Sequence, residues 1–255
     1  GKVFAGNLTP DVATGLGAWS SADFWRALHH GRSRDGRLLY PAFPYPNYTQ
    51  VTREDSDALY AYLRSLPAVA QPRTPHALRF PFSTQAALAV WRALYFRPGQ
   101  PPEDLSRSAE WNRGAYLVQG LGHCTACHTP RNALGAERKA QALGGGTVAG
   151  QGWYAPALDM PAEAGVAQWS LQDVVALLQT GVAPQGSVTG PMAEVVFRST
   201  QHLTPTDARA IAVYLQALPQ RSAPAVVAEP PAAAAALARG AKVYEQHCAQ
   251  CHGDQ

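Results

Sequence analysis

Apolar residues recur at helical spacing in two segments, residues 51–67 and 203–219, and predict a helix in each. The stripe of the first segment consists of Leu59, Tyr62, Leu63 and Leu66, and that of the second of Ile211, Tyr214, Leu215 and Leu218. Pro67 and Pro219 follow the two stripes. Because proline has no amide N–H for a helix, each helix is predicted to end before it, with its stripe in the core.

Short polar residues mark where helices begin. Ser170 precedes an apolar-periodic segment, and Asp173 follows it by three residues; Thr204 and Asp207 have the same relation. This spacing resembles a capping box with Asp in place of Glu, so helices are predicted to start directly after Ser170 and Thr204. A further helix is predicted within residues 108–120.

The helical pattern occurs twice because the chain contains an internal repeat. Residues 15–36 align with residues 165–186 at an offset of 150, and the two striped segments align at an offset of 152. Residues 113–128 resemble residues 239–252 in the same way. The repeat therefore predicts small helical modules that follow one another along the chain.

Proline-rich stretches separate the modules, and the apolar middle of the first stretch is expected to form a bridging helix. We predict five parts: the C-terminal part of a first module (1–67), a linker (68–106), a complete second module (107–219), a second linker (220–236) and the start of a third module (237–255).

Composition excludes some classes of protein. Only 15% of the 255 residues are charged, and the net charge of +3 is too small to indicate nucleic-acid binding. No apolar run reaches the ~18 residues of a membrane span. With 46% hydrophobic residues, the chain is able to bury a core.

All four cysteines lie in two motifs, HCTACH (123–128) and HCAQCH (247–252). A C-x-x-C pair alone is compatible with a redox disulfide or with half of a zinc site. A His directly after the second cysteine indicates attachment of c-type haem. The two thiols can form thioether bonds to the two vinyl groups of one porphyrin, and the His can bind its iron.

The motifs predict two covalent haem c groups. The attachment residues are Cys124, Cys127, Cys248 and Cys251, and the proximal iron ligands are His128 and His252. A zinc module would need a further Cys or His pair close by, and a thiol-redox motif explains neither the His nor the duplication. No group of residues resembles a catalytic acid, base or nucleophile.

The iron that His128 binds also needs a ligand on its opposite face, for which a methionine thioether is the usual choice in electron carriers. The two methionines of the chain are Met160 and Met192. We prefer Met192, in GSVTGPMAEVV; the alternative for either is to fill a gap in the core.

The carbonyl of Pro130 is predicted to accept the second N–H of His128. Arg131, Trp153 and Tyr154 are candidates for contact with the haem propionates, although Arg131 is equally compatible with an ordinary surface charge.

The first module differs at the position that matches Met192. Ala42 or Phe43 stands there, depending on one gap, and neither side chain can bind iron. The first module should carry a haem of its own, with its C-x-x-C-H motif expected upstream of Gly1, and this haem is predicted to be five-coordinate or bound by a nitrogen ligand. His29 and His30 are candidates, with a surface position as the alternative for each.

Several stretches resemble the three-haem cytochrome c subunits of bacterial membrane-associated dehydrogenases of the alcohol and gluconate type. They are NLTPDVATGLGAWSSADFWRALHHG, GRLLYPAFPY, DALYAYLRSLP, NRGAYLVQGLGHCTACHTPRN and GPMAEVV, and they span nearly the whole chain. The resemblance implies an all-α fold of tandem class I cytochrome c-like domains joined by Pro-rich linkers. The Phe43 form resembles the branch that is paired with molybdenum hydroxylases.

The resemblance also implies a periplasmic location and electron transfer from a catalytic dehydrogenase subunit to quinone or a terminal oxidase. A third haem site is expected upstream of Gly1, and the body of the third module and a membrane anchor are expected beyond Gln255. Two rival functions remain open: a haem enzyme with an open iron in the first module, and a zinc or thiol-redox protein.

Overall fold

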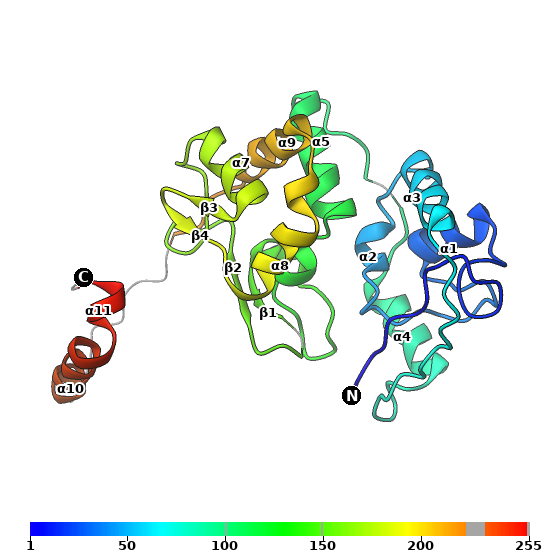
Figure 1. The fold of residues 1–255 in the computed structure, drawn as a ribbon, viewed down its shortest axis with the longest axis horizontal. Coiled ribbons are helices and arrows are strands. Elements are labelled where there is room, and N and C mark those ends of the chain that lie inside the picture. Colours follow the sequence, from blue (N-terminus) through cyan, green and yellow to red (C-terminus); the bar gives the residue numbers. More distant parts are fainter. Residues whose placement is uncertain (100, 149, 223–232, 254–255) are drawn as a thin grey trace. The chain divides into compact units, whose positions relative to one another are not determined.

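The computed structural model describes residues 1–99, 101–148, 150–222 and 233–253, with the backbone alone described for Cys251 and His252 (Figure 1). The chain divides into two compact units, Gly1–Ser222 and Ala223–Gln255. In the second unit the described residues form helices α10 (Ala233–His247) and α11 (Ala249–His252).

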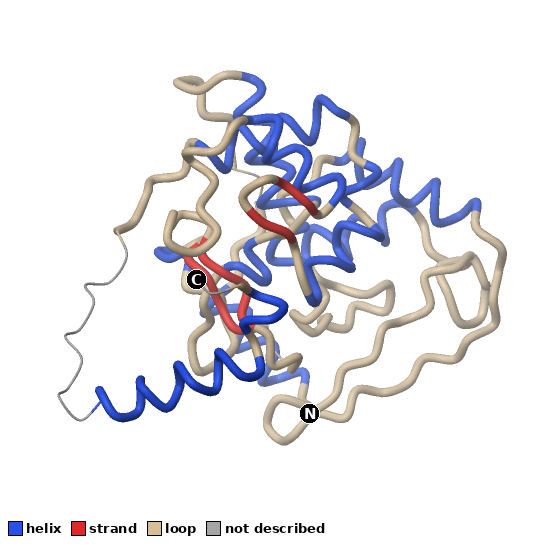
Figure 2. Tube along the Cα trace, turned by 60° about the vertical axis from the view of Figure 1, so that its left-hand side comes forward, coloured by secondary structure: helices blue, strands red, loops and turns tan. Residues whose placement is uncertain are grey.

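The first unit is rich in helices, as predicted. Its α-helices are α1 (Ser21–His30), α2 (Tyr45–Tyr48), α3 (Arg53–Ser65), α4 (Gln85–Tyr95), α5 (Ala109–Tyr116), α6 (Thr125–His128), α7 (Leu171–Thr180), α8 (Gly190–Arg198) and α9 (Pro205–Gln216). A π-helical turn covers Leu117–Leu121, and 3-10 turns cover Lys139–Gln141 and Thr200–His202. The strands form two antiparallel pairs, visible as separate hairpins in Figure 2: β1 (Gly144–Thr147) with β2 (Tyr154–Ala157), and β3 (Val182–Ala183) with β4 (Gly186–Ser187).

The predicted helix starts are confirmed. The side chains of Ser108, Ser170 and Thr204 each accept the backbone N–H three residues later, at the starts of α5, α7 and α9. The box at Ser170 is half formed, because the carboxylate of Asp173 accepts from Gln185 instead of the Ser170 N–H. Local capping thus sets the helix starts, while a distant side chain takes the second bond.

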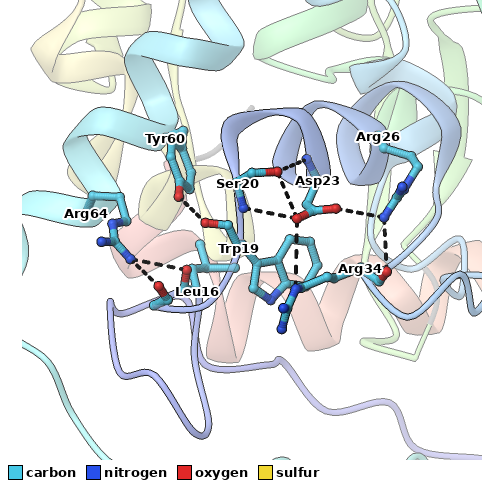
Figure 3. Close-up of polar contacts among 9 residues, drawn as sticks. Leu16, Trp19, Ser20, Asp23, Arg26, Arg34, Tyr60 and Arg64 are labelled. Atoms are coloured by element: carbon cyan, nitrogen blue, oxygen red, sulfur yellow. Dashed lines mark hydrogen bonds and ion pairs between the residues drawn. The ribbon is translucent and has the colours of Figure 1, made fainter.

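α1 carries the complete form of the same cap (Figure 3). Ser20 and Asp23 exchange hydrogen bonds, and Arg26 pairs with Asp23 at 2.8 Å. Two residues of α3 tie it to the segment before α1: the Tyr60 hydroxyl donates to the Trp19 carbonyl, and Arg64 donates to the carbonyl of Gly17 at 2.6 Å. These bonds close one side of a small core, whose buried members are Leu16, Phe24 and Leu28.

The largest core surrounds the crossing of α5 and α9. Its buried members are Leu117, Val118, Leu143, Val166, Val174, Leu178, Ile211, Ala212, Tyr214 and Leu215. A Cβ at Gly114 of α5 would lie 2.0 Å from the Ala210 carbonyl oxygen of α9, so only glycine lets the two helices approach this closely. The apolar stripe predicted for residues 203–219 therefore lies in the core.

The prediction that the apolar stripe of residues 51–67 lies in the core is wrong in part. Leu59 is 39% exposed and Tyr62 is 63% exposed, whereas Ser56 of the same helix is fully buried. α3 packs against α1 through Tyr60 and Leu63. In α9 this face packs against α5. No helix among the described residues crosses the corresponding face of α3, so Leu59 and Tyr62 are exposed to solvent.

The predicted bridging helix forms as α4 and contacts both neighbouring parts of the first unit. Trp91 Nε1 donates to the Leu134 carbonyl at 2.9 Å, and Arg92 donates to the His30 carbonyl at 2.7 Å. The Arg92 guanidinium also lies 5.0 Å from the centre of the Tyr45 ring. Within the described residues, no helix is both long and apolar enough to cross a membrane.

The ion pair between Arg113 of α5 and Asp207 of α9 predicts acid sensitivity. Two N–O contacts of 2.8 and 3.0 Å join them, and the hydrogen bonds from Arg113 lower the pKa of Asp207 below 3.8. A lowered pKa in the folded state stabilises the fold above the unfolded pKa of about 3.9, and this stabilisation is lost as the pH falls through the lower folded value. We expect Asp207→Asn to lower the free energy of unfolding at pH 7 by up to about 1 kcal/mol and to reduce its decline in acid.

Urea unfolding at pH 7 and pH 3 measures both effects. Glu110→Gln is the matched control, because Glu110 pairs with Arg209 between the same two helices but at a more exposed place, and it should cost less. An unchanged acid decline in Asp207→Asn would contradict the prediction.

Candidate functional site

One helical turn, α6, carries the first C-x-x-C-H motif. The backbone turns sharply at His123, with φ of 38°, and the Cys124 N–H then donates to the Val118 carbonyl at 2.9 Å. The N–H of His128 donates to the Cys124 carbonyl at 3.0 Å. Residues three and four apart lie on one face of a helix, so the turn presents Cys124, Cys127 and His128 together.

The two thiols are free in this structure, and burial raises their pKa values. The pKa of the Cys124 thiol rises to about 11, and that of Cys127 is also raised. A thiol-redox site needs the opposite shift, because the thiolate is the reactive form. The surroundings of these cysteines therefore disfavour thiol-redox chemistry.

The imidazole of His128 has one nitrogen held by the backbone. Its Nδ1 lies 2.7 Å from the Pro156 carbonyl oxygen, and burial lowers its pKa, which favours the neutral ring. With Nδ1–H donating to Pro156, Nε2 is left with a free lone pair, as in metal-binding histidines.

The prediction that the Pro130 carbonyl accepts the second N–H of His128 is wrong. The Pro130 carbonyl accepts from the Arg138 N–H at 2.8 Å instead. Pro156 lies on β2, and the β1–β2 hairpin packs against α6. Sequence reasoning missed it because Pro156 is 28 residues from His128 and reaches it only through the fold of the hairpin.

A cavity of about 690 Å³ reaches this turn. Its lining includes Cys127, Leu143, Val148, Tyr48 and Trp91. Its volume lies within the range of cofactor and ligand sites, about 300–1,000 Å³. His128 and Met192 do not line it. Because the proposed iron ligands lie outside its lining, the cavity does not define the haem site; the fit to a covalently bound haem rests on the two unpaired thiols and the oriented imidazole.

The two methionines have different surroundings. Met160 is only 7% exposed, and its carbonyl accepts backbone N–H groups of Glu163 and Gly165 in a tight turn. Met192 lies partly exposed in the first turn of α8. α8 packs against α7 and the Thr200–His202 turn, whereas α6 packs against β1 and β2. The structure thus gives Met160 a core position and leaves the Met192 thioether more accessible.

The three side chains suggested for propionate contact each contact other groups of the protein. Arg131 donates to the carbonyls of Ala126 and Gly135 at 2.7 and 2.8 Å. The Tyr154 hydroxyl donates to Glu163 at 3.0 Å. The Trp153 ring lies against Gly190, where φ is +53° and a Cβ would come within 2.7 Å of the ring. Trp153 therefore holds the start of α8, two residues before Met192.

In the first segment, Phe43 packs as a partly buried ring against the Leu16, Phe24 and Leu28 cluster. The ring of His29 stacks on Trp25 at 4.4 Å, and His30 meets it edge-on at 4.8 Å. Burial lowers the pKa of both histidines. Both are partly buried and partly exposed, so the surface position and the role as ligand both stay predictions for each.

The second motif is described less fully. Cys248 is a free, partly buried cysteine whose N–H donates to the Tyr244 carbonyl at 2.8 Å. The side chains of Cys251 and His252 lie outside the described residues. Among the residues that are described, no three Cys, His, Asp or Glu side chains are arranged to hold a metal ion.

Known proteins identify the family. No family model matches the chain. The chain is 42% identical to a diheme cytochrome c-type protein of Cereibacter sphaeroides, over 84% of this chain and 70% of that protein. It is 35% identical to the fructose dehydrogenase cytochrome subunit of Gluconobacter japonicus, over 99% of this chain. It belongs to the c-type cytochromes, and its relatives include cytochrome subunits of dehydrogenases.

Another relative of this cytochrome chain is a nicotinate dehydrogenase subunit of Pseudomonas putida, at 43% identity over the whole chain. The chain spans 21% of that protein and 56% of the fructose dehydrogenase subunit. The predicted family is thus confirmed.

Proposed function

We propose that this chain is an electron-transferring part of a multihaem c-type cytochrome, built from tandem cytochrome c-like modules with no substrate chemistry of their own. One observation carries the proposal: a single helical turn presents two unpaired thiols and a His whose Nδ1 is held by a backbone carbonyl. Bound there, haem supplies an iron that accepts and returns one electron at a time.

The residues of the chain have separate tasks at this site. Cys124 and Cys127 would hold the porphyrin, and His128, oriented by the Pro156 carbonyl, would bind the iron through Nε2. Met192 would supply a second ligand to the iron, and Trp153 fixes the start of its helix. Buried apolar residues such as Leu143 exclude water from the site.

The second motif repeats this chemistry. Cys248 and Cys251 attach another haem, with His252 as its proximal ligand, and a third haem belongs to the segment before Gly1. The proposed modules are residues 1–67, 107–219 and 237–255, joined by the linkers 68–106 and 220–236.

The partner that fits is the catalytic subunit of a dehydrogenase, since relatives are named for nicotinate, fructose, alcohol and gluconate dehydrogenases. Electrons then pass to quinone or a terminal oxidase, in a membrane-associated complex of the periplasm.

A haem count tests the proposal. Expressed in a periplasm with cytochrome maturation, the chain should carry two covalent haems by pyridine haemochrome and intact mass. Cys124→Ala/Cys127→Ala should leave one, and Cys248→Ala/Cys251→Ala should also leave one. A chain that carries zinc or a disulfide instead of haem would overturn the proposal.

A further inference from the structure

Asn47 of α2 is buried against the C-x-x-C-H turn. Its Nδ2 donates to Thr125 Oγ1 at 2.6 Å and to the Gln119 carbonyl at 3.1 Å. Asn47 is 4% exposed and Thr125 is 7% exposed. Thr125 stands between the two cysteines, so one amide group joins the end of the π-helical turn to the motif itself.

The Gln119 carbonyl needs this partner. At the end of the π-helical turn the backbone N–H groups of Gly122, His123 and Cys124 donate to the carbonyls of Leu117, Gly120 and Val118. None of these bonds uses Gln119. Its carbonyl receives side-chain amides instead, from Asn47 and from Gln50 at 3.4 Å. A helix-end carbonyl without a backbone partner is costly to bury, so Asn47 stabilises this turn.

α2 also contacts the other side of the motif. The Tyr48 ring meets the His123 ring edge-on, with centroids 5.5 Å apart and planes at 78°. His123 has a left-handed backbone, which is strained for a non-glycine residue and persists only where neighbours hold it. α2 thus holds the residues on either side of Cys124.

We infer that Asn47 is a positioning residue for the haem site of Cys124 and Cys127. Its two hydrogen bonds fix the turn that carries both thiols and His128, and thereby set the orientation of the His128 ring at the iron. The inference rests on the proposed function. Residues beyond the ligands tune a metal site by orienting those ligands, so loss of Asn47 should change the electronic state of this haem.

The test uses the whole chain with Cys248→Ala and Cys251→Ala, so that Cys124 and Cys127 hold its single haem. Asn47→Leu keeps the approximate volume and removes both donors. We expect one haem per chain, with a shifted midpoint potential and shifted low-spin EPR g-values. Asn112→Leu is the matched control and should change neither, because the Asn112 amide also donates to two carbonyls, those of Asp104 and Ser108, away from the motif.

A double-mutant cycle with Thr125→Val tests whether Asn47 acts through its hydrogen bond to Thr125. The shift of Asn47→Leu/Thr125→Val should stay below the sum of the two single shifts, because both remove the same hydrogen bond. Additive shifts would overturn the inference, and so would an unchanged spectrum and potential in Asn47→Leu or an equal shift in Asn112→Leu.

The test separates a failure of the proposed function from a failure of the Asn47→Leu variant to fold. If the parent chain with both Cys substitutions carries no haem, the proposed function fails. If that parent carries haem and Asn47→Leu yields too little protein, Asn47→Ser, a smaller polar replacement, is judged by the same potential and EPR criteria.

Discussion

Gly114→Ala is expected to lower the free energy of unfolding by about 3 kcal/mol, the upper end for overpacked sites. The added Cβ would lie 2.0 Å from the Ala210 carbonyl oxygen and 2.7 Å from Tyr214 Cβ, so the backbone of α9 would have to move. Alanine favours a helix over glycine by about 1 kcal/mol, which is too little to offset this clash. For a unit of this size the melting temperature should fall by about 6–12 °C.

Gly240→Ala is the matched control. Gly240 occupies the same place in its copy of the repeat, but a Cβ there meets nothing within 4 Å. Thermal unfolding followed by circular dichroism should give an unchanged melting temperature for Gly240→Ala. Equal melting temperatures for Gly114→Ala and the parent would mean that α5 and α9 do not cross this closely.

Met192→Ala is expected to abolish the near-infrared sulfur-to-iron absorption of the haem at Cys124 and Cys127. It should also lower the midpoint potential of that haem by about 0.1 V or more, because a thioether ligand favours reduced iron and axial ligands span about 0.8 V. Optical spectra and redox titration of the chain with Cys248→Ala and Cys251→Ala measure both.

Met160→Leu provides the comparison. Met160 is 7% exposed, and replacement by a residue of similar volume should cost less than about 1.5 kcal/mol and leave spectrum and potential unchanged. Loss of the absorption band in Met160→Leu, with its retention in Met192→Ala, would mean that Met160 is the iron ligand and Met192 is not.

The helices could be predicted where local interactions decide them. Ser108, Ser170 and Thr204 cap helices through bonds to residues three positions away, and these bonds form wherever the segment is helical. The burial of a stripe is not local. Leu59 and Ile211 hold matching positions, but Ile211 lies under α5, while Leu59 has no crossing helix over it among the described residues.

The sequence by itself determined that Cys124, Cys127 and His128 come together, because they lie within five residues and need only one helical turn to share a face. Tertiary structure alone decided which groups support that turn. Pro156 comes from 28 residues away through a hairpin, and Asn47 from 78 residues away through α2. Such partners depend on how separate elements pack, and no spacing along the chain specifies that packing.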